Sequence, residues 1–511
     1  MTRLRIENAT YVVTVDDNDQ ILRNATITID DGVITSITSV DPTSERKATR
    51  ERKATEDPQP KAEEESAGRP LAGSGGSTTE RQRGSADVLR PPPESSGAVG
   101  DGRVTAPVED VLTIDATNKL VMPGLVNLHT HLPMTLLRGL AENVDLQGFL
   151  ARVWAAEGAV MDPGTVELGA TLGALESLLA GCTTQLDMYF HHEATHRGAV
   201  AAGSRHVIGP VFFDGPGPDG LAWEERVANL RAWPAVIDEI GGPRVPLSAM
   251  PHATYTCSPE GFAEVVAVLR EVHAGSNRPA VLTTHVSENV SENDGIRERH
   301  GATPTELLAK AGWVEPDLPL VVGHGVHLTA GDLQLLADGH AAVGHCPGSN
   351  LKLASGALNW ETVRDSGVRL TLGTDGCSSS NDLDMWQVMR QAALLARLTS
   401  GRPDVASASE VLRAATIEGA RALGLGDEIG SVEVRKRADL VLVDLAAPHL
   451  TPVHDVAALL VFAAGRGDVS DVLVDGEVVV RERRSTRLDT ADLLARAAAR
   501  GAVARAAAEA Q

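Results

Sequence analysis

Between Pro123 and about Gly426 the sequence repeats one pattern, in which a short β-rich run precedes a longer helical stretch. The β-rich runs are Leu125–His131, Thr183–Tyr189, His206–Asp214, Val245–His252, Ala280–Val286, Leu320–His324, Ala341–His345 and Arg369–Asp375. Amphipathic stretches between them include Val166–Ala180, Pro259–Ala274, Thr303–Ala311 and Leu328–Ala337. Strands that alternate with helices imply a parallel sheet, and eight such units predict an α/β fold, a (β/α)8 TIM barrel over residues 123–427.

Titratable side chains stand at the ends of these predicted strands. They are His129, His131, Asp187, Asp214, His252, His285, His324, His345 and Asp375. In a TIM barrel the C-terminal ends of the strands meet at one mouth, where the active site lies. Any one of these residues alone is weak evidence, but their shared placement predicts a single site at that mouth.

Short β-rich runs also occur towards both ends of the chain. They are Leu4–Val15, Ala25–Ile37, Val111–Ile114, Lys119–Met122, Ala438–Asp444 and Val469–Val480. We expect residues 1–42, 104–122 and 428–485 to form a small β-sandwich side domain beside the barrel. The Ala/Arg-rich residues 486–511 are expected to form a C-terminal helical tail.

One stretch, residues 43–103, differs from the rest in composition. It contains no Ile, Phe, Trp, Tyr, Met or Cys, and its 11 basic residues balance 11 acidic ones. Such a segment cannot bury enough apolar surface to offset the entropy of ordering it, so a disordered insertion is predicted. Since the insertion is neutral overall, the net charge of −23 belongs to the remainder of the chain.

This acidity restricts the partners of the protein. Nucleic-acid phosphates and anionic membrane surfaces would be repelled, so neither is expected as a partner. No apolar run approaches the roughly 20 residues that span a bilayer, and the N-terminus does not resemble a secretory signal. Four dispersed cysteines in 511 residues are no disulfide framework. We therefore expect a cytoplasmic protein, assembled as a homo-oligomer, that acts on a small molecule.

A metal site is predicted from four of the strand-end residues. His129 and His131 form an HxH pair on the first predicted barrel strand, where alternate residues face the same side. About 0.5 such pairs would occur by chance at this histidine content, so the pair alone is weak. His285 on strand five and Asp375 on strand eight complete a set of three imidazoles and one carboxylate. That set suits one divalent ion, Zn²⁺ or alternatively Fe²⁺, with room for a water.

Several motifs resemble the amidohydrolase superfamily. They are PGLVNLHTH at 123–131, HVSE at 285–288, HGVHL at 324–328 and LGTDG at 372–376, in the order of that superfamily. HLPMTLLRG at 131–139, DMYFH at 187–191 and SNLKL at 349–353 are similar to its metal-dependent aminohydrolase branch. Within that branch they resemble the 5′-methylthioadenosine/S-adenosylhomocysteine deaminases. The resemblance covers the chain except the insertion and the tail.

The resemblance implies a barrel with a side β-sandwich and a single metal ion. Binuclear members carry a carbamylated lysine on strand four, whereas Val245–His252 contains no lysine. The implied metal ligands are His129, His131, His285 and Asp375.

The resemblance also implies catalytic roles. A metal-activated hydroxide attacks the amino-bearing carbon, Asp375 takes a proton from the water, and Glu288 protonates a ring nitrogen and helps ammonia leave. His324 hydrogen-bonds the attacking water without binding metal. Both carboxylates, Glu288 and Asp375, therefore also contact the substrate.

Two further residues match family contacts to a nucleoside. Glu157 matches a glutamate that holds ribose hydroxyls, although a solvated helix face is an equal interpretation of its surroundings. His252 matches a histidine that contacts the nucleoside. The family arginine for the amino-acid tail has no partner in register here, since Arg226 and Arg231 are both displaced, which leaves the 5′ group of the substrate open.

The predicted function is hydrolytic deamination of an adenosine-type nucleoside to its inosine analogue and ammonia. An alternative is a deaminase or chlorohydrolase of another heterocycle, such as guanine, a pterin, an s-triazine or aminodeoxyfutalosine. Glu157 and His252 favour the nucleoside, because a bare base has no ribose to bind. A catalytically inactive barrel scaffold is a further alternative, which the complete set of four ligand positions disfavours.

Overall fold

The computed structural model describes residues 3–39 and 111–509, and of Gln147 it describes the backbone alone. The predicted disordered insertion, residues 43–103, lies outside the described residues. Within the described ranges, no helix is both long and apolar enough to cross a membrane.

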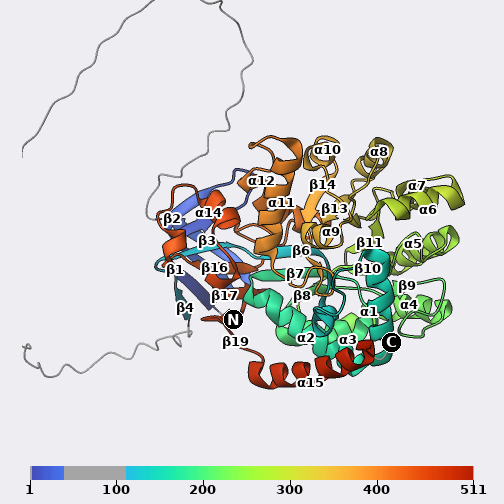
Figure 1. Cartoon of the computed structure of the whole chain (residues 1–511). Helices are drawn as coiled ribbons and strands as arrows, with labels where there is room; N and C mark the ends of the chain where they lie inside the picture. The colour runs from blue at the N-terminus through green and yellow to red at the C-terminus, as the bar shows by residue number, and fades with distance from the viewer. Residues whose placement is uncertain (1–2, 40–110, 510–511) are drawn as a thin grey trace, which may run out of the picture. The chain divides into compact units, whose positions relative to one another are not determined.

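Strands from both ends of the chain form one nine-stranded sheet (Figure 1). They are β1 (Arg3–Val13), β2 (Ile21–Asp30), β3 (Val33–Ser39), β4 (Leu112–Asp115), β5 (Lys119–Pro123), β16 (Leu440–Asp444), β17 (Val469–Val474), β18 (Glu477–Arg481) and β19 (Arg484–Ser485). Their order is β19-β18-β17-β16-β5-β1-β2-β3, with β4 beside β1. The antiparallel pair of β5 and β16 joins the two chain ends, whereas the second layer of a sandwich stays a prediction.

The region between these strands contains two parallel sheets and is of the α/β class. A four-stranded sheet has the order β15 (Asp375–Gly376), β6 (Leu125–His131), β7 (Cys182–Asp187) and β8 (Arg205–Val207). A six-stranded sheet has the order β14 (Arg369–Leu372), β13 (Ala342–His345), β12 (Leu320–His324), β11 (Ala280–Val286), β10 (Leu247–Pro251) and β9 (Val211–Phe212). The strands β6, β7 and β11 are buried along their whole length, as parallel strands covered on both faces should be.

Two strands that the sequence predicted as continuous are each divided. The third predicted strand splits into β8 and β9, because Pro210 lacks an N–H and a Cβ at Gly209 would lie 1.7 Å from the Ser248 carbonyl oxygen. The eighth splits into β14 and β15 at Gly373, where a Cβ would lie 2.9 Å from the Cβ of His129. Each break leaves its two strands in different sheets.

Helices follow most strands, and most of the helix N-termini carry a side chain that caps them. They are α1 (Leu146–Val160), α2 (Pro163–Leu179), α3 (His192–Ala202), α4 (Trp223–Ile240), α5 (Pro259–Ala274), α6 (Val290–His300), α7 (Pro304–Lys310), α8 (Ala330–Asp338), α9 (Pro347–Lys352), α10 (Trp360–Asp365), α11 (Met385–Ser400), α12 (Ala408–Ala414), α13 (Ile417–Ala422), α14 (Val456–Phe462) and α15 (Thr490–Glu509), with short 3-10 turns at Leu132–Leu137, Pro448–Leu450 and Arg466–Asp468. Asp162 caps α2 through the N–H of Thr165, and Thr303 with Glu306 forms a capping box on α7.

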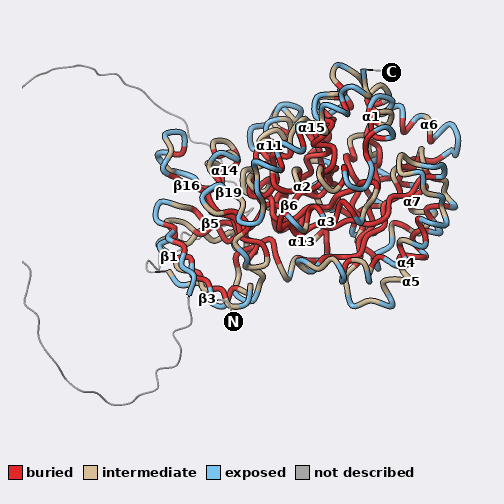
Figure 2. The backbone as a smooth tube through the Cα atoms, turned by 90° about the horizontal axis from the view of Figure 1, so that it is seen from below, coloured by how far each residue is buried: buried red, intermediate tan, exposed pale blue. Residues whose placement is uncertain are grey.

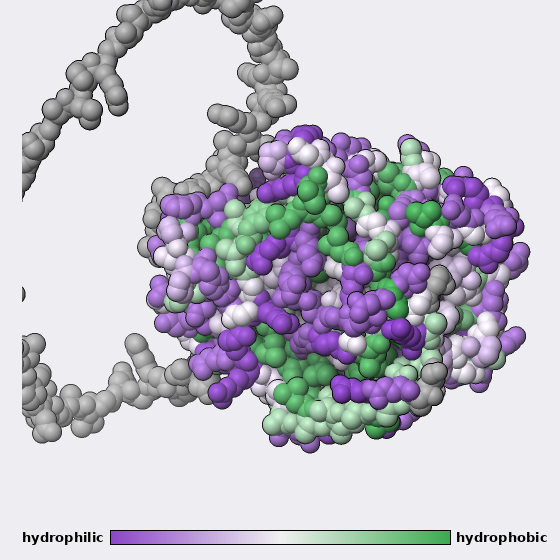
Figure 3. Space-filling view, in the orientation of Figure 1, coloured by the Kyte–Doolittle hydropathy of each residue, from purple (hydrophilic) through white to green (hydrophobic). Residues whose placement is uncertain are grey.

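Burial concentrates in the parallel strands and the inner faces of the helices (Figure 2). A buried ion pair links the parallel strands to the nine-stranded sheet, since Arg205 on β8 lies 2.8 Å from Asp439 just before β16. The predicted C-terminal helix is present as α15, which is visible as a pale green band at the lower edge of Figure 3. It buries Leu493, Ala497 and Ala504.

Candidate active site

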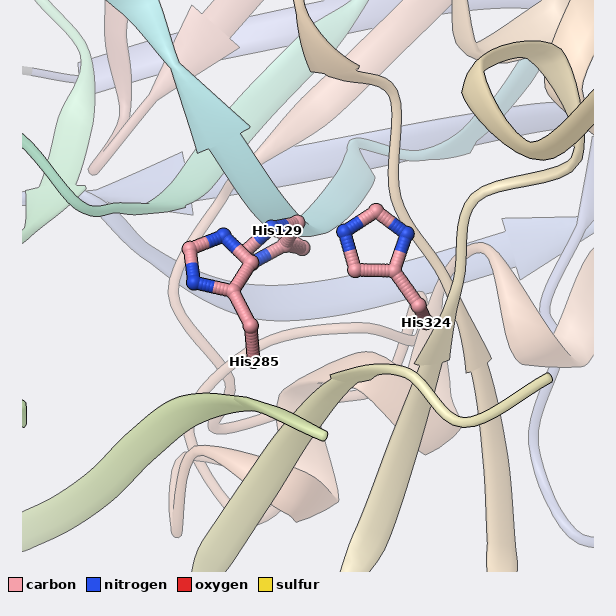
Figure 4. Close-up of side chains that lie close together, drawn as sticks. All are labelled: His129, His285 and His324. Carbon is pink, nitrogen blue, oxygen red and sulfur yellow. The ribbon is translucent and has the colours of Figure 1, made fainter. Parts of the chain in front are cut away.

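The ends of four strands bring five titratable side chains together. His129 and His131 come from β6, His285 from β11, His324 from β12 and Asp375 from β15. Ligand atoms of His129, His285 and His324 lie within 4.8 Å of one another, and so do those of His129, His131 and Asp375. Figure 4 shows the imidazoles of His129, His285 and His324 turned towards a common centre. The convergence predicted from the strand ends is thus observed for these five residues.

Backbone carbonyl groups fix two of the imidazoles. Nδ1 of His131 lies 2.6 Å from the carbonyl oxygen of Met188, and Nδ1 of His285 lies 2.7 Å from that of His252. A carbonyl only accepts, so both Nδ1 atoms carry the proton, and the Nε2 atoms face each other 3.4 Å apart. This arrangement is typical of metal-binding histidines, whose second ring nitrogen donates to a carbonyl or carboxylate.

The electrostatics of the cluster favour a cation at its centre. Asp375 Oδ1 lies 3.1 Å from His131 Nε2 and 3.7 Å from His129 Nε2, and the latter is buried without a hydrogen-bond partner among the described residues. Burial lowers the pKa of His131, but the hydrogen bond and charge of Asp375 outweigh burial and raise it to about 9. Imidazole nitrogens beside a buried carboxylate oxygen therefore fit a divalent metal ion such as zinc.

The local backbone makes room for this cluster. A Cβ on Gly323 would lie 2.9 Å from the His129 ring, and one on Gly373 would be equally close to the His129 Cβ, so both positions favour glycine. Asp375 and His324 adopt left-handed φ angles of 60° and 67°. Non-glycine residues in that region carry strain, and such residues often occur at functional sites.

Glu288 and His324 lie beside the cluster. His324 Nδ1 donates to Asn350 Oδ1 over 2.9 Å, and His324 Nε2 lies 3.8 Å from Glu288 Oε2. Burial raises the pKa of Glu288. The loop that carries Glu288 is held by Glu292, whose carboxylate accepts the N–H groups of Ser287 and Glu288 over 3.1 and 2.8 Å.

A pocket opens over the cluster. Beyond His131, His285, His324, Glu288 and Asp375, its lining includes the aromatic residues Phe149, Trp154, Tyr189, Phe190, Phe213 and Tyr255. His252 also lines it, stacked on Phe213 with ring centroids 5.1 Å apart, and burial lowers the pKa of His252 to about 3. Tyr189 and Phe190 belong to the DMYFH motif, whereas nothing in the sequence distinguishes Phe149, Trp154 and Phe213 from core aromatic residues.

Glu157 lies in the same pocket, on α1. It is 1% exposed, so the alternative interpretation as a solvated helix face is wrong. Tyr189 Oη donates to Glu157 Oε1 over 2.6 Å, while Glu157 Oε2 is buried and has no partner among the described residues. Burial raises the pKa of this carboxyl to about 7. An unpartnered carboxylate oxygen therefore faces a pocket that also holds the histidine cluster.

The remaining candidates lie outside the pocket lining. Asp187 Oδ2 lies 3.0 Å from His206 Nε2, and Asp214 accepts the N–H of Ser258, the N-cap residue of α5, over 3.0 Å. Arg231 pairs on the surface with Glu271, 3.2 Å away. Arg226 is buried and bound by Asp219 at 2.5 Å. His345 is buried at the end of β13, and burial lowers its pKa to about 3.

Comparison with known proteins gives consistent matches over most of the chain. Residues 120–479 match the amidohydrolase family. A 5-methylthioadenosine/S-adenosylhomocysteine deaminase of Thermococcus kodakarensis is 41% identical over 72% of this chain and 84% of its own length. A 5′-deoxyadenosine deaminase of Methanosarcina acetivorans is 37% identical over 80% of this chain and 93% of its own. A crystal structure of an adenosine deaminase from Xanthomonas campestris with bound zinc has a TM-score of 0.79 and 31% identity, and covers 99% of both chains.

Proposed function

The chain belongs to the amidohydrolase family, and from this premise we propose that it deaminates an adenosine-type nucleoside to the inosine analogue and ammonia. Its class is that of a hydrolase acting on carbon–nitrogen bonds in cyclic amidines, which confirms the class predicted from the motifs. The observation that carries the proposal is the shared pocket, because the histidine–aspartate cluster and the unpartnered Glu157 Oε2 both line one cavity.

We further infer that the two parallel sheets close into the predicted (β/α)8 barrel and that the nine-stranded sheet belongs to a β-sandwich side domain. The parallel pairing of β6 with β15 supports the closure, since it joins the first and last units of the repeat. A cytoplasmic location and a homo-oligomeric state stay predictions from the sequence.

We propose His129, His131, His285 and Asp375 as the ligands of one divalent ion, with zinc favoured and Fe²⁺ the alternative. The facing Nε2 atoms and the unpartnered Nε2 of His129 support this assignment. When bound, such an ion acts as a Lewis acid that makes water a nucleophile near neutral pH. His324 is not included, because its Nδ1 bonds Asn350 Oδ1 and its Nε2 lies 3.8 Å from Glu288 Oε2.

Side chains of the protein transfer the protons and orient the attacking oxygen. Asp375 accepts a proton from the attacking water, and His324, oriented by Asn350, hydrogen-bonds the incoming oxygen. Glu288 donates a proton to a ring nitrogen of the substrate, regains a proton from Asp375 and passes it to the departing amine. The hydroxyl proton of the adduct then returns to Glu288 as the carbonyl forms. The raised pKa of Glu288, caused by burial, suits it to begin the reaction protonated. Water thus replaces the amino group, and ammonia leaves.

The nucleoside is held at the other side of the pocket. Ribose hydroxyls can donate to the unpartnered Glu157 Oε2, which removes the penalty of a buried acceptor without a donor. His252, Trp154 and Phe213 lie around the pocket as an aromatic wall, with Trp154 and His252 centroids 5.8 Å apart. Aromatic faces of this kind suit a planar heterocycle.

The experiment is a deamination assay on zinc-loaded enzyme, with chelated enzyme as the control. The substrates are 5′-methylthioadenosine, 5′-deoxyadenosine, guanine and an amino-s-triazine, and ammonia release is measured. We expect turnover of both nucleosides, little turnover of the bare heterocycles, and loss of all activity on chelation. Turnover of guanine or the triazine without turnover of either nucleoside would overturn the proposal.

A further inference from the structure

We propose that this pocket selects nucleosides with an uncharged 5′ substituent, such as 5′-deoxy or 5′-methylthio, over those with a zwitterionic amino-acid tail. We propose further that Asp219 contributes to this selection by holding Arg226 out of the pocket. The inference rests on the proposed function, because it concerns the substrate class of the same site. Relatives of the chain act, by name, on nucleosides of both kinds, so the distinction is chemically relevant.

The charged groups that line the pocket all have carboxyl side chains, apart from its histidines. They are Glu157, Glu288 and Asp375, and among the described lining residues there is no lysine or arginine. The carboxylate of an amino-acid tail would therefore find no guanidinium or ammonium partner among these lining residues. Placing such a charge in a pocket without a partner is costly, whereas a methyl or methylthio group has no charge to compensate.

The wall formed by α1 is apolar. Leu146, Phe149, Leu150 and Val153 line the pocket from this helix, and Met134 and Leu353 line it from neighbouring segments. A thioether or a methyl group gains contact and loses water against such a wall. The apolar wall therefore favours an uncharged 5′ substituent, as does the absence of lysine and arginine from the described pocket lining.

An arginine does lie next to the pocket, but it is already paired. Arg226 Nη1 and Nη2 bond the two carboxylate oxygens of Asp219 over 2.9 and 2.5 Å, and Nη1 also donates to the Val211 carbonyl over 2.8 Å. The side chains of Arg226 and Asp219 are 1% and 3% exposed. The guanidinium carbon lies 5.5 Å from the ring centre of Phe213, which itself lines the pocket. The Arg226 guanidinium thus lies behind the pocket-lining ring of Phe213, where Asp219 balances its charge.

The first test compares kcat/KM for 5′-methylthioadenosine and S-adenosylhomocysteine on the zinc-loaded full-length enzyme. The carboxylate of S-adenosylhomocysteine would lack a cationic partner among the described residues that line the pocket. We therefore expect kcat/KM to be at least about tenfold higher for 5′-methylthioadenosine. An equal or higher value for S-adenosylhomocysteine overturns the inference while leaving the proposed function intact. Failure to deaminate either nucleoside counts instead against the proposed function.

The second test alters the charge of the wall. Leu150→Arg places a guanidinium on the pocket-facing side of α1, and Leu150→Gln is the uncharged matched control. We expect Leu150→Arg, and not Leu150→Gln, to lower the preference for 5′-methylthioadenosine by about fivefold or more, as a new charged hydrogen bond would. A preference that is the same in both variants would show that charge is not the determinant.

The third test concerns the arginine itself. Asp219→Asn keeps the shape of the side chain but removes the charge that pairs with Arg226. We expect the preference for 5′-methylthioadenosine to fall, because the guanidinium is then attracted to the carboxylate of the tail. An unchanged preference in folded, metal-loaded protein would overturn the role of Asp219. If this variant does not fold, Asp219→Glu, which keeps the charge, gives the comparison, and there a fall would contradict the role.

Discussion

The two ends of the pocket are built in different ways. At the metal end, His131 and His285 extend from buried strands, and each has its Nδ1 fixed by a backbone carbonyl. At the other end, the wall is one face of α1, where Glu157 is held by a single hydrogen bond from Tyr189 and its neighbours by apolar packing. The chemistry thus belongs to strand ends whose geometry is fixed by the sheet, and substrate choice belongs to a helix face. Substitutions at the metal end should therefore lower catalysis, whereas substitutions on α1 should change substrate preference.

The largest effect is expected at the metal end. Asp375→Asn removes the only carboxylate of the ligand set and the acceptor of the water proton, so metal content and activity should fall together, activity by at least about 1,000-fold. Metal analysis of the purified protein and ammonia release measure the two quantities. Ser379→Ala, which removes a 2.7 Å hydrogen bond to Asp375 Oδ2, should cost about 10- to 100-fold. An Asp375→Asn enzyme with full metal and activity would contradict the ligand assignment.

A substitution at Glu288 separates proton transfer from metal binding. Glu288→Gln should lower kcat by about 100- to 10,000-fold, because the general acid is lost, while the metal content stays unchanged. Glu298→Gln, at an exposed position on α6, is the matched control and should have no effect. If Glu288→Gln loses its metal, the role given to this residue is wrong.

A smaller effect on kcat is expected at Glu292, which only positions the loop that carries Glu288. Glu292→Gln replaces one acceptor of the N–H groups of Ser287 and Glu288 by a donor, which should displace the loop. We expect kcat to fall about tenfold with little change in KM, since one charge-assisted hydrogen bond is lost. If KM instead changed as much as kcat in both the Glu288 and the Glu292 variants, both residues would act through substrate binding.

At the α1 end, we expect Glu157 to make the free energy of unfolding depend on pH. Burial raises the pKa of Glu157 from 4.5 to about 7, so between these values the unfolded chain loses a proton that the folded chain keeps. Stability therefore falls as pH rises through this window, by about 3 kcal/mol at most. Glu157→Gln should remove this loss. As pH rises from 5 to 8, the melting temperature of the variant should therefore increase relative to that of the wild type. The same profile in both proteins would show that Glu157 ionises freely in the fold.

The sequence predicted the two ends unequally. The HxH spacing of His129 and His131 is local and places both rings on one side of a strand, and the strand-end positions of His285 and Asp375 completed the predicted cluster. The burial of Glu157 depends on how α1 docks over the strand ends, which no local pattern records, and a solvated face was an equal interpretation. For the same reason Trp154 and Phe213 could not be distinguished from core aromatics.

The parallel strands show the same limit. The runs Ala280–Val286 and Leu320–His324 were predicted with the bounds of β11 and β12, because both are short runs rich in β-branched residues. The break at Gly209 and Pro210 was missed, although the Gly-Pro pair is a local signal for it. The close approach of the Ser248 carbonyl to Gly209 is a tertiary contact that no local pattern shows.

If one pocket joins a hydrolytic metal end to a nucleoside-binding end, the ribose must contribute strongly to turnover. The measurement is kcat/KM for 5′-methylthioadenosine and for adenine, in the wild type and in Glu157→Gln, both loaded with zinc. We predict that the wild type prefers the nucleoside by at least about 100-fold and that Glu157→Gln loses most of this preference without losing activity on adenine. Equal turnover of adenine and the nucleoside by the wild type, or a preference that Glu157→Gln leaves intact, would contradict the account.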